Sequence, residues 1–370
     1  MAEASGAEQS DESVRPFRIG ISDEAIGDLK RRLANIRWPH KETADGWVQG
    51  VPLHKAREVA DYWLNHYDWR RFEARANSHP QYITRIDNPD VHFFHVPSKH
   101  SDAIPVLLMH GWPGSIVEFI RLIEPLVDPE AYGGRAEDAF HVVLPSLPGW
   151  GFTEPPREQG WTHARTARMC AALMVRLGYG KWVAQGGDYG AHVLSDLAEH
   201  PPEGLAAIHL NLLFAIPREL GEHATEEERE AFEAFRWTQL EEGGFSRFQK
   251  TRPQTLGYSL TDSPIGQAMW IYEKFHRWTD NTGNPEDAIG IDDMLDNISL
   301  HLVHPKRRPV RSRILGSAEL NFWWCAHQIA GGSHCIQKRY LQISPLMGGT
   351  TLSEFDLLER AGERRALWHA

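Results

Sequence analysis

The segment GGDYG at 186–190 contains the residue best suited to chemistry in this chain, the aspartate Asp188. An apolar run, KWVAQ at 181–185, precedes it, and a helical pattern, AHVLSDLAE at 191–199, follows it. Small residues two positions before and after a central side chain permit a sharp strand-to-helix turn, because Cβ atoms would crowd the backbone there. Such a turn exposes the central side chain, so Asp188 is a candidate nucleophile.

A carboxylate in this position indicates a particular electrophile. Most turns of this type expose a serine, but no Gly-x-Ser-x-Gly sequence occurs in the chain. A carboxylate that attacks carbon forms an alkyl ester, so the expected substrate is an epoxide or an alkyl halide. The alternative interpretation is an ordinary glycine turn in which Asp188 caps the following helix, since aspartate is a favoured N-cap residue. The motif by itself leaves both interpretations open.

Composition narrows the class of protein. The 370 residues are 41% hydrophobic, which allows a sizeable core, and a net charge of -11 argues against nucleic acid or anionic membrane as a partner. The three cysteines, Cys170, Cys325 and Cys335, show no metal or disulfide spacing and suit a reducing compartment. No run reaches transmembrane length, and residues 1–14 lack the features of a signal peptide. We therefore predict a soluble, cytoplasmic protein that needs no cofactor and binds no metal.

The periodicity of apolar residues predicts an alternation of strands and helices. A hairpin is expected at 82–86 and 91–96, since the two runs alternate around Asn88-Pro89-Asp90. Further strands are expected at 104–109, 140–144, 181–185 and 205–213, and helices at 22–38, 53–64, 116–126, 162–177 and 191–199. Alternation of this kind predicts parallel βαβ units.

The pattern changes between residues 217 and 297, where helical segments are rich in aromatic and charged residues. We interpret this segment as a lid over the carboxyl ends of the strands, where open α/β sheets bind their ligands. An ordinary helical subdomain would show the same periodicity.

With these motifs in order, the chain resembles the microsomal type of epoxide hydrolases. The resemblance covers residues 16–301 and includes an amino-terminal extension. It depends on HGWPGS at 110–115, PSLPGWGFT at 145–153, GGDYG, and TRPQTLGYSLTDSPIGQAMWIYEKF at 251–275. It implies an α/β-hydrolase fold with a helical extension before the core and an inserted helical lid.

The resemblance also implies roles for site residues. Asp188 would open the epoxide by backside attack, giving a hydroxyalkyl ester, and water would then hydrolyse this ester. The backbone N–H groups of Trp112 and Tyr189 would stabilise the oxyanion that forms. The partners implied are therefore a small apolar epoxide and water, with no cofactor.

A lid tyrosine protonates the epoxide oxygen in this family, and the chain departs from the family here. Many relatives have a Gly-Tyr dipeptide where this chain has Gly243-Gly244-Phe245. Tyr258 and Tyr272 remain as candidate donors. Either could instead be a packing residue of the lid, an interpretation that the helical neighbours of Tyr272 favour for that residue.

The chain also departs from the family at the general base. Relatives carry a histidine in a Gly-Gly-His-Phe sequence and an acidic residue that orients it, and neither motif is found here. The resemblance stops abruptly after His301. Read one base forward, codons compatible with 302–315 allow WFTQNAARSARVYW, and those of 364–368 allow GGHFG, so we propose a shifted reading frame. In the printed frame His327 and His334 are weak substitutes.

The predicted organisation and function follow from these observations. The expected parts are a disordered tail at 1–15, the extension and first strands at 16–100, the hydrolase core at 101–216, the lid at 217–297, and a divergent, frameshifted tail at 298–370 that could leave the last strands missing. We predict an epoxide hydrolase of detoxification or secondary metabolism. The alternatives are an inactive remnant without its histidine base and, more weakly, a haloalkane dehalogenase.

Overall fold

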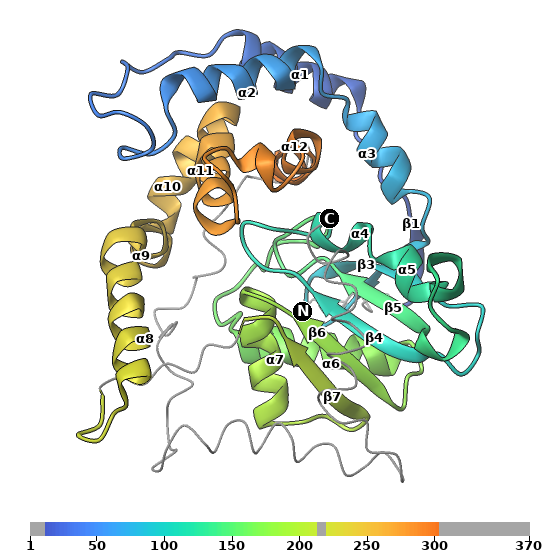
Figure 1. Cartoon of the computed structure of the whole chain (residues 1–370). Helices are drawn as coiled ribbons and strands as arrows, with labels where there is room; N and C mark the ends of the chain where they lie inside the picture. Colours follow the sequence, from blue (N-terminus) through green and yellow to red (C-terminus); the bar gives the residue numbers. More distant parts are fainter. Residues whose placement is uncertain (1–11, 213–219, 303–370) are drawn as a thin grey trace, which may run out of the picture. The chain divides into compact units, whose positions relative to one another are not determined.

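The computed structural model describes residues 12–212 and 220–302, which group into two compact units (Figure 1). The first unit consists mainly of residues 12–20, 73–205 and 209–212, and the second mainly of residues 21–72 and 220–302. Most of the predicted tail at 1–15 and of the divergent tail at 298–370 therefore lies outside the described residues.

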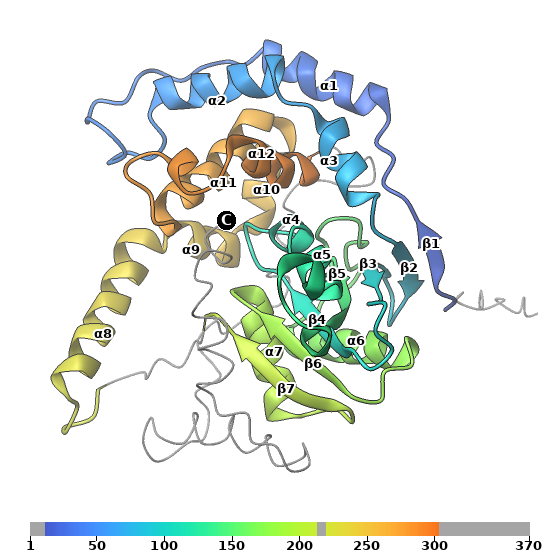
Figure 2. The same ribbon diagram turned by 45° about the vertical axis from the view of Figure 1, so that its right-hand side comes forward.

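Within the described residues, the first unit contains a mixed, seven-stranded sheet. Its strands run in the order β1-β2-β3-β5-β4-β6-β7. Adjacent strands from β1 through β3 to β5 pair antiparallel, and Figure 2 shows the edge that β1, β2 and β3 form. β4 pairs parallel with both β5 and β6. The strands are β1 Arg15–Phe17, β2 Gln81–Arg85, β3 Asp90–Val96, β4 Ile104–Met109, β5 Phe140–Pro145, β6 Trp182–Gly186 and β7 Leu205–Leu210.

The parallel register brings two distant loops together. β4 lies between β5 and β6, and its side chains from Val106 to Met109 are buried, as expected for a strand covered on both faces. Its last residue, Met109, pairs with Gly186, the last residue of β6. The carboxyl ends of both strands therefore meet at one edge of the sheet. The HGWPGS loop and the GGDYG turn both begin there, which confirms the predicted parallel arrangement and positions the site.

Helices of different lengths flank the sheet in the first unit (Figure 1). The predictions for α6 and α7 are confirmed, but the continuous helix expected at 116–126 is wrong. It is divided into α4 and α5, because Pro125 lacks an N–H group and its ring would clash with the carbonyl of Arg121. The elements are α4 Val117–Ile120, α5 Ile123–Val127, η1 Pro129–Tyr132, η2 Ala136–Asp138, α6 His163–Arg176 and α7 Tyr189–Glu199.

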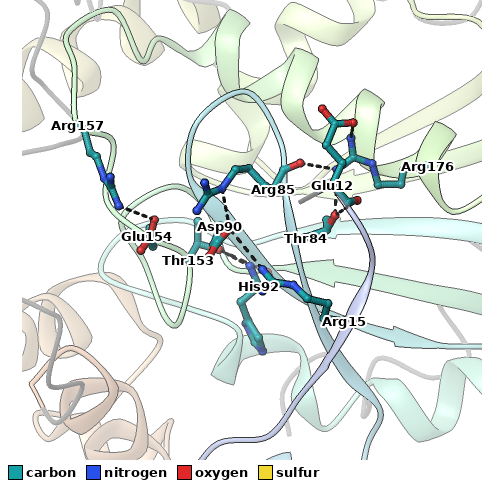
Figure 3. Close-up of polar contacts among 10 residues, drawn as sticks. All are labelled: Glu12, Arg15, Thr84, Arg85, Asp90, His92, Thr153, Glu154, Arg157 and Arg176. Carbon is teal, nitrogen blue, oxygen red and sulfur yellow. Dashed lines mark hydrogen bonds and ion pairs between the residues drawn. The ribbon is translucent and has the colours of Figure 1, made fainter. Parts of the chain in front are cut away.

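Polar contacts attach the residues before and within β1 to this unit (Figure 3). The Thr84 hydroxyl donates to the Glu12 carbonyl at 2.9 Å, and Arg176 of α6 pairs with the Glu12 carboxylate at 2.9 Å. Asp90 pairs with Arg85 at 3.0 Å and with Arg15 at 3.7 Å. The amino-terminal extension therefore contributes an edge strand to the sheet as well as helices.

The second unit is helical. Ser22 caps α1, since its side chain accepts the N–H of Ala25. α1 ends at Ala34 rather than Trp38, because the Asn35 side chain donates to the Arg31 carbonyl and terminates the helix. The helices are α1 Asp23–Ala34, α2 Leu53–Asn65, the first turn of α3 Trp69–Ala76, α8 Glu226–Trp237, η3 Thr238–Glu242, α9 Gly244–Thr251, α10 Pro253–Asp262, α11 Pro264–Trp278, η4 Pro285–Asp287 and α12 Ile291–Leu300.

A polar cluster joins the amino-terminal helices to α12 within this second unit. The Asp296 side chain is fully buried and accepts hydrogen bonds from Arg71 at 2.7 Å and from the Tyr67 hydroxyl at 2.9 Å. The Trp63 indole donates to the Ser299 hydroxyl at 3.1 Å. These contacts bridge more than two hundred residues of sequence, so the helices of the extension pack with α12 inside the second unit.

We expect Arg71→Met to lower the free energy of unfolding by about 2 kcal/mol, because it leaves the Asp296 carboxylate buried without its cation. The partial exposure of Arg71, 30%, keeps the loss below that of a fully buried pair. Urea denaturation measures this difference. Arg70→Met is the matched control, since Arg70 pairs with an Asp23 that is 96% exposed, and it should change stability by less than about 0.5 kcal/mol. Equal effects of the two variants would contradict the prediction.

Candidate active site

Asp188 occupies a strained turn between β6 and α7. Its backbone has φ 49° and ψ −121°, a conformation that costs an L-residue roughly 1–3 kcal/mol. Asp188 precedes α7 at the N-cap position, but its side chain forms no N-cap hydrogen bond, so the geometry does not support the interpretation of Asp188 as an ordinary helix cap. Backbone strain of this kind is characteristic of residues at functional sites.

The neighbouring glycines permit this turn because the backbone passes close to other atoms. A Cβ added to Gly190 would overlap the carbonyl of Met109 in β4. A Cβ on Gly187 would overlap the side chain of Asn211, and one on Gly186 would lie 3.0 Å from the Gly190 backbone. The glycine spacing recognised in the sequence is therefore a packing requirement of the elbow.

Two backbone N–H groups meet the Asp188 carboxylate. The Trp112 N–H donates to Oδ1 at 2.8 Å, and the Tyr189 N–H also forms a hydrogen bond with this carboxylate. Enclosure by protein raises the pKa of Asp188 above its ordinary value, and the two N–H groups partly offset the shift by stabilising the charged form. The two residues named from sequence as oxyanion donors thus lie beside the candidate nucleophile.

The HGWPGS loop is held in place by its first residue. His110 is buried, its Nε2 accepts the Leu147 N–H at 3.2 Å, and its Nδ1 lies 3.2 Å from the Gly111 carbonyl. The Trp112–Pro113 peptide bond that follows is cis. Because both ring nitrogens are engaged, His110 positions this loop and is not a free base.

A second buried histidine anchors the PSLPGWGFT loop. His92 of β3 contacts the Ser146 hydroxyl through Nδ1 at 2.9 Å and the Gln81 amide oxygen through Nε2 at 3.0 Å. Its backbone N–H donates to the Thr153 hydroxyl at 2.9 Å (Figure 3). The loop at 145–153 is therefore attached at both its ends to a strand of the sheet.

The candidate proton donors differ in their surroundings. Tyr258 on α10 is 71% exposed. Tyr272 on α11 is fully buried and donates to the Glu286 carboxylate at 2.6 Å, so it has the contacts of a packing residue. Phe245 stacks edge-on with the Trp278 ring at 5.2 Å and offers no donor. The three belong to the second unit, and Asp188 to the first.

The remaining predictions concern the cysteines, the substitute histidines, the proposed frameshift, metal binding and membrane spans. His327, His334, Cys325, Cys335 and the proposed frameshift lie outside the described residues. Cys170 is a buried thiol in α6, consistent with a structural role. Among residues 12–212 and 220–302, no group of three or more His, Cys, Asp or Glu side chains is arranged to bind a metal ion. No helix in those ranges is long and apolar enough to span a membrane.

The pKa shift of Asp188 predicts a pH dependence. Only the ionised carboxylate attacks carbon, so ester formation should be lost as pH falls through the pKa of Asp188. Because that pKa is raised, we expect the midpoint above 3.8, the ordinary value. Mass spectrometry of acid-quenched reactions with an epoxide, at a series of pH values, measures the rate of ester formation. A midpoint at or below the ordinary value would contradict the prediction.

This sheet, with its elbow between β6 and α7 and its backbone donors after β4, defines a member of the α/β-hydrolase fold. A family model described as the alpha/beta hydrolase fold matches residues 104–239, and one described as the epoxide hydrolase N terminus matches residues 14–119. The chain belongs to the epoxide hydrolase family, whose members are hydrolytic enzymes. The predicted family and fold are thereby confirmed.

Individual relatives support the same conclusion. The chain is 35% identical to "Epoxide hydrolase 1" of Sus scrofa over 80% of its own length and 70% of that protein's. A relative from Stigmatella aurantiaca, also named as an epoxide hydrolase, is 53% identical over 78% of this chain, and the match spans 66% of the relative. Among solved structures, juvenile hormone epoxide hydrolase of Bombyx mori superimposes with a TM-score of 0.74 at 29% identity, covering 83% of this chain and 77% of that one.

Proposed function

We propose that this protein opens an epoxide to a vicinal diol through an alkyl ester on Asp188. The observation that supports this mechanism best is the position of Asp188 at the elbow, with Oδ1 held by the Trp112 N–H at 2.8 Å. That bond fixes one carboxylate oxygen and orients the group for attack through the other. Membership of the epoxide hydrolase family agrees with the choice of an epoxide as the electrophile.

In the first step, a carboxylate oxygen of Asp188 forms a bond to an epoxide carbon, and the strained carbon–oxygen bond breaks with its electron pair moving to oxygen. That oxygen takes a proton. We assign the donation to Tyr258, whose side chain is accessible, because a phenol can donate a proton to oxygen and is a poor nucleophile in its neutral form.

In the second step, water attacks the ester carbonyl carbon. The N–H groups that meet the Asp188 carboxylate, those of Trp112 and Tyr189, would then stabilise the negative charge on the carbonyl oxygen. Collapse of this intermediate releases the diol and returns Asp188 to its carboxylate form. The attacking water must lose a proton, so this step requires a base.

The missing histidine motif supports a second candidate, a protein that forms the ester and does not hydrolyse it. The two candidates differ only in whether the Asp188 ester is hydrolysed, so that the protein can react again. Incubation with styrene oxide, followed by intact-protein mass spectrometry and chromatography of the diol, separates them. Diol in excess over protein supports the hydrolase, whereas one stable adduct per chain without diol supports the stalled remnant. If no adduct and no diol are formed, the proposed mechanism is overturned. Reaction with an alkyl bromide in place of the epoxide would indicate a dehalogenase.

A further inference from the structure

Glu118 places a second carboxyl next to the candidate active site, and nothing in the mechanism above uses it. It lies in α4, directly after the HGWPGS loop, and its side chain turns back towards that loop. The Gly111 N–H forms a hydrogen bond with the Glu118 carboxyl. A Cβ added to Gly114 would overlap both oxygens of the same carboxyl. The carboxyl group therefore lies against the backbone of the loop that supplies the Trp112 donor.

Gly111 contacts both carboxyl groups. A Cβ added to Gly111 would overlap the Asp188 side chain, including Oδ1. The N–H groups of two consecutive residues thus diverge, with Gly111 donating to Glu118 and Trp112 donating to Asp188. Glu118 and Asp188 are therefore separated by little more than one residue of backbone. The Glu118 carboxyl is near enough for the charge of Asp188 to act on it.

Water reaches Glu118, since the side chain is exposed at the surface of the described residues although protein surrounds it on its other sides. The surrounding protein, and then the charge of Asp188, raise the pKa of Glu118. Contact with solvent offsets part of that shift. Esterification neutralises Asp188, so the second contribution disappears and the ionised form of Glu118 becomes more favourable in the ester intermediate. That intermediate is the one that requires a base.

We propose that Glu118 binds the water that hydrolyses the Asp188 ester and accepts its proton. The water oxygen forms a bond to the ester carbonyl carbon, its proton passes to the Glu118 carboxylate, and the carbonyl electron pair moves to the oxygen held by the N–H groups. When the carbon–oxygen bond to the diol breaks, the departing alkoxide takes that proton from Glu118. The second proton of the water remains on the Asp188 carboxyl and passes to solvent, which restores both carboxylates and replaces the proton donated in the first step. This inference rests on the proposed function, because it begins from the ester.

The test separates ester formation from ester hydrolysis in the full-length chain. Glu118→Gln keeps an oxygen that can accept the Gly111 N–H but cannot take a proton. With styrene oxide in rapid-quench experiments, we expect ester formation at an unchanged rate and ester hydrolysis slowed by about 10²-fold to 10⁴-fold, so that the adduct accumulates. Glu118→Asp should recover part of the hydrolysis rate. Glu124→Gln in α5, whose side chain is 55% exposed, is the matched control and should behave as the unchanged protein.

Each other outcome overturns the inference. An adduct that already accumulates in the unchanged protein shows that Glu118 does not act as the base. Equal hydrolysis by Glu118→Gln and the unchanged protein shows that the charge is dispensable, and slowed ester formation with normal hydrolysis shows a role confined to holding the loop. No adduct or diol in any variant, despite unchanged melting curves, contradicts the ester mechanism itself and is therefore distinct from failure of Glu118 alone.

Discussion

Replacing Asp188 with asparagine is expected to lower the rate of ester formation from an epoxide by roughly 10³-fold or more, because an amide lacks the charge that attacks carbon. The substitution is nearly isosteric and keeps an oxygen for the Trp112 N–H, which lies 2.8 Å from Oδ1. Single-turnover reactions with enzyme in excess, followed by digestion and mass spectrometry, measure the rate and locate the adduct. An adduct on another residue, or undiminished labelling, would contradict the assignment of the nucleophile.

Asp188→Gly serves as a structural companion to that experiment. It also removes the nucleophile, but glycine adopts the φ of 49° without the strain that a Cβ imposes. We expect this variant to be inactive and more stable than the unchanged protein by about 1 kcal/mol, since the strain amounts to roughly 1–3 kcal/mol. A loss of stability would indicate that the side chain contributes more to the fold than to the chemistry.

Gly190→Ala is expected to lower the free energy of unfolding by about 3 kcal/mol or more, the upper part of the range for overpacking in a close-packed site. The added methyl group would overlap the carbonyl and the backbone carbon of Met109, and a backbone inside a sheet cannot move aside as a flexible side chain can. Because Gly190 follows Asp188 by two residues, surviving folded protein should also form the ester more slowly. Urea denaturation and the single-turnover assay measure the two effects.

Gly180→Ala provides the control for that substitution. Gly180 lies just before β6, and no atom lies within 4 Å of a Cβ added there. We expect the free energy of unfolding of the Gly180→Ala variant to stay within about 0.5 kcal/mol of that of the unchanged protein, as for most surface substitutions. If both alanine variants were equally stable, the close approach of Gly190 to β4 would not be what holds the elbow.

Much of the first unit was predictable because its signals are local. Continuous apolar runs identified β4 and β5, alternation identified the hairpin of β2 and β3, and the glycine spacing located the elbow at Asp188. The broken helix at 116–126 was missed, although its cause, Pro125, is also local. The roles of Trp112 and Tyr189 came from family resemblance, and their N–H groups indeed lie at the Asp188 carboxylate.

By itself the sequence determined the order of the elements, the family and the residue at the elbow, because periodicity, glycine spacing and motifs act over a few neighbouring residues. Only the tertiary structure decided which side chains meet. Trp112 and Asp188 stand 76 residues apart, and the parallel register of β4 and β6 joins them. The proximity of Glu118 to Asp188, and the difference between exposed Tyr258 and buried Tyr272, likewise depend on packing between distant segments, which no local pattern encodes.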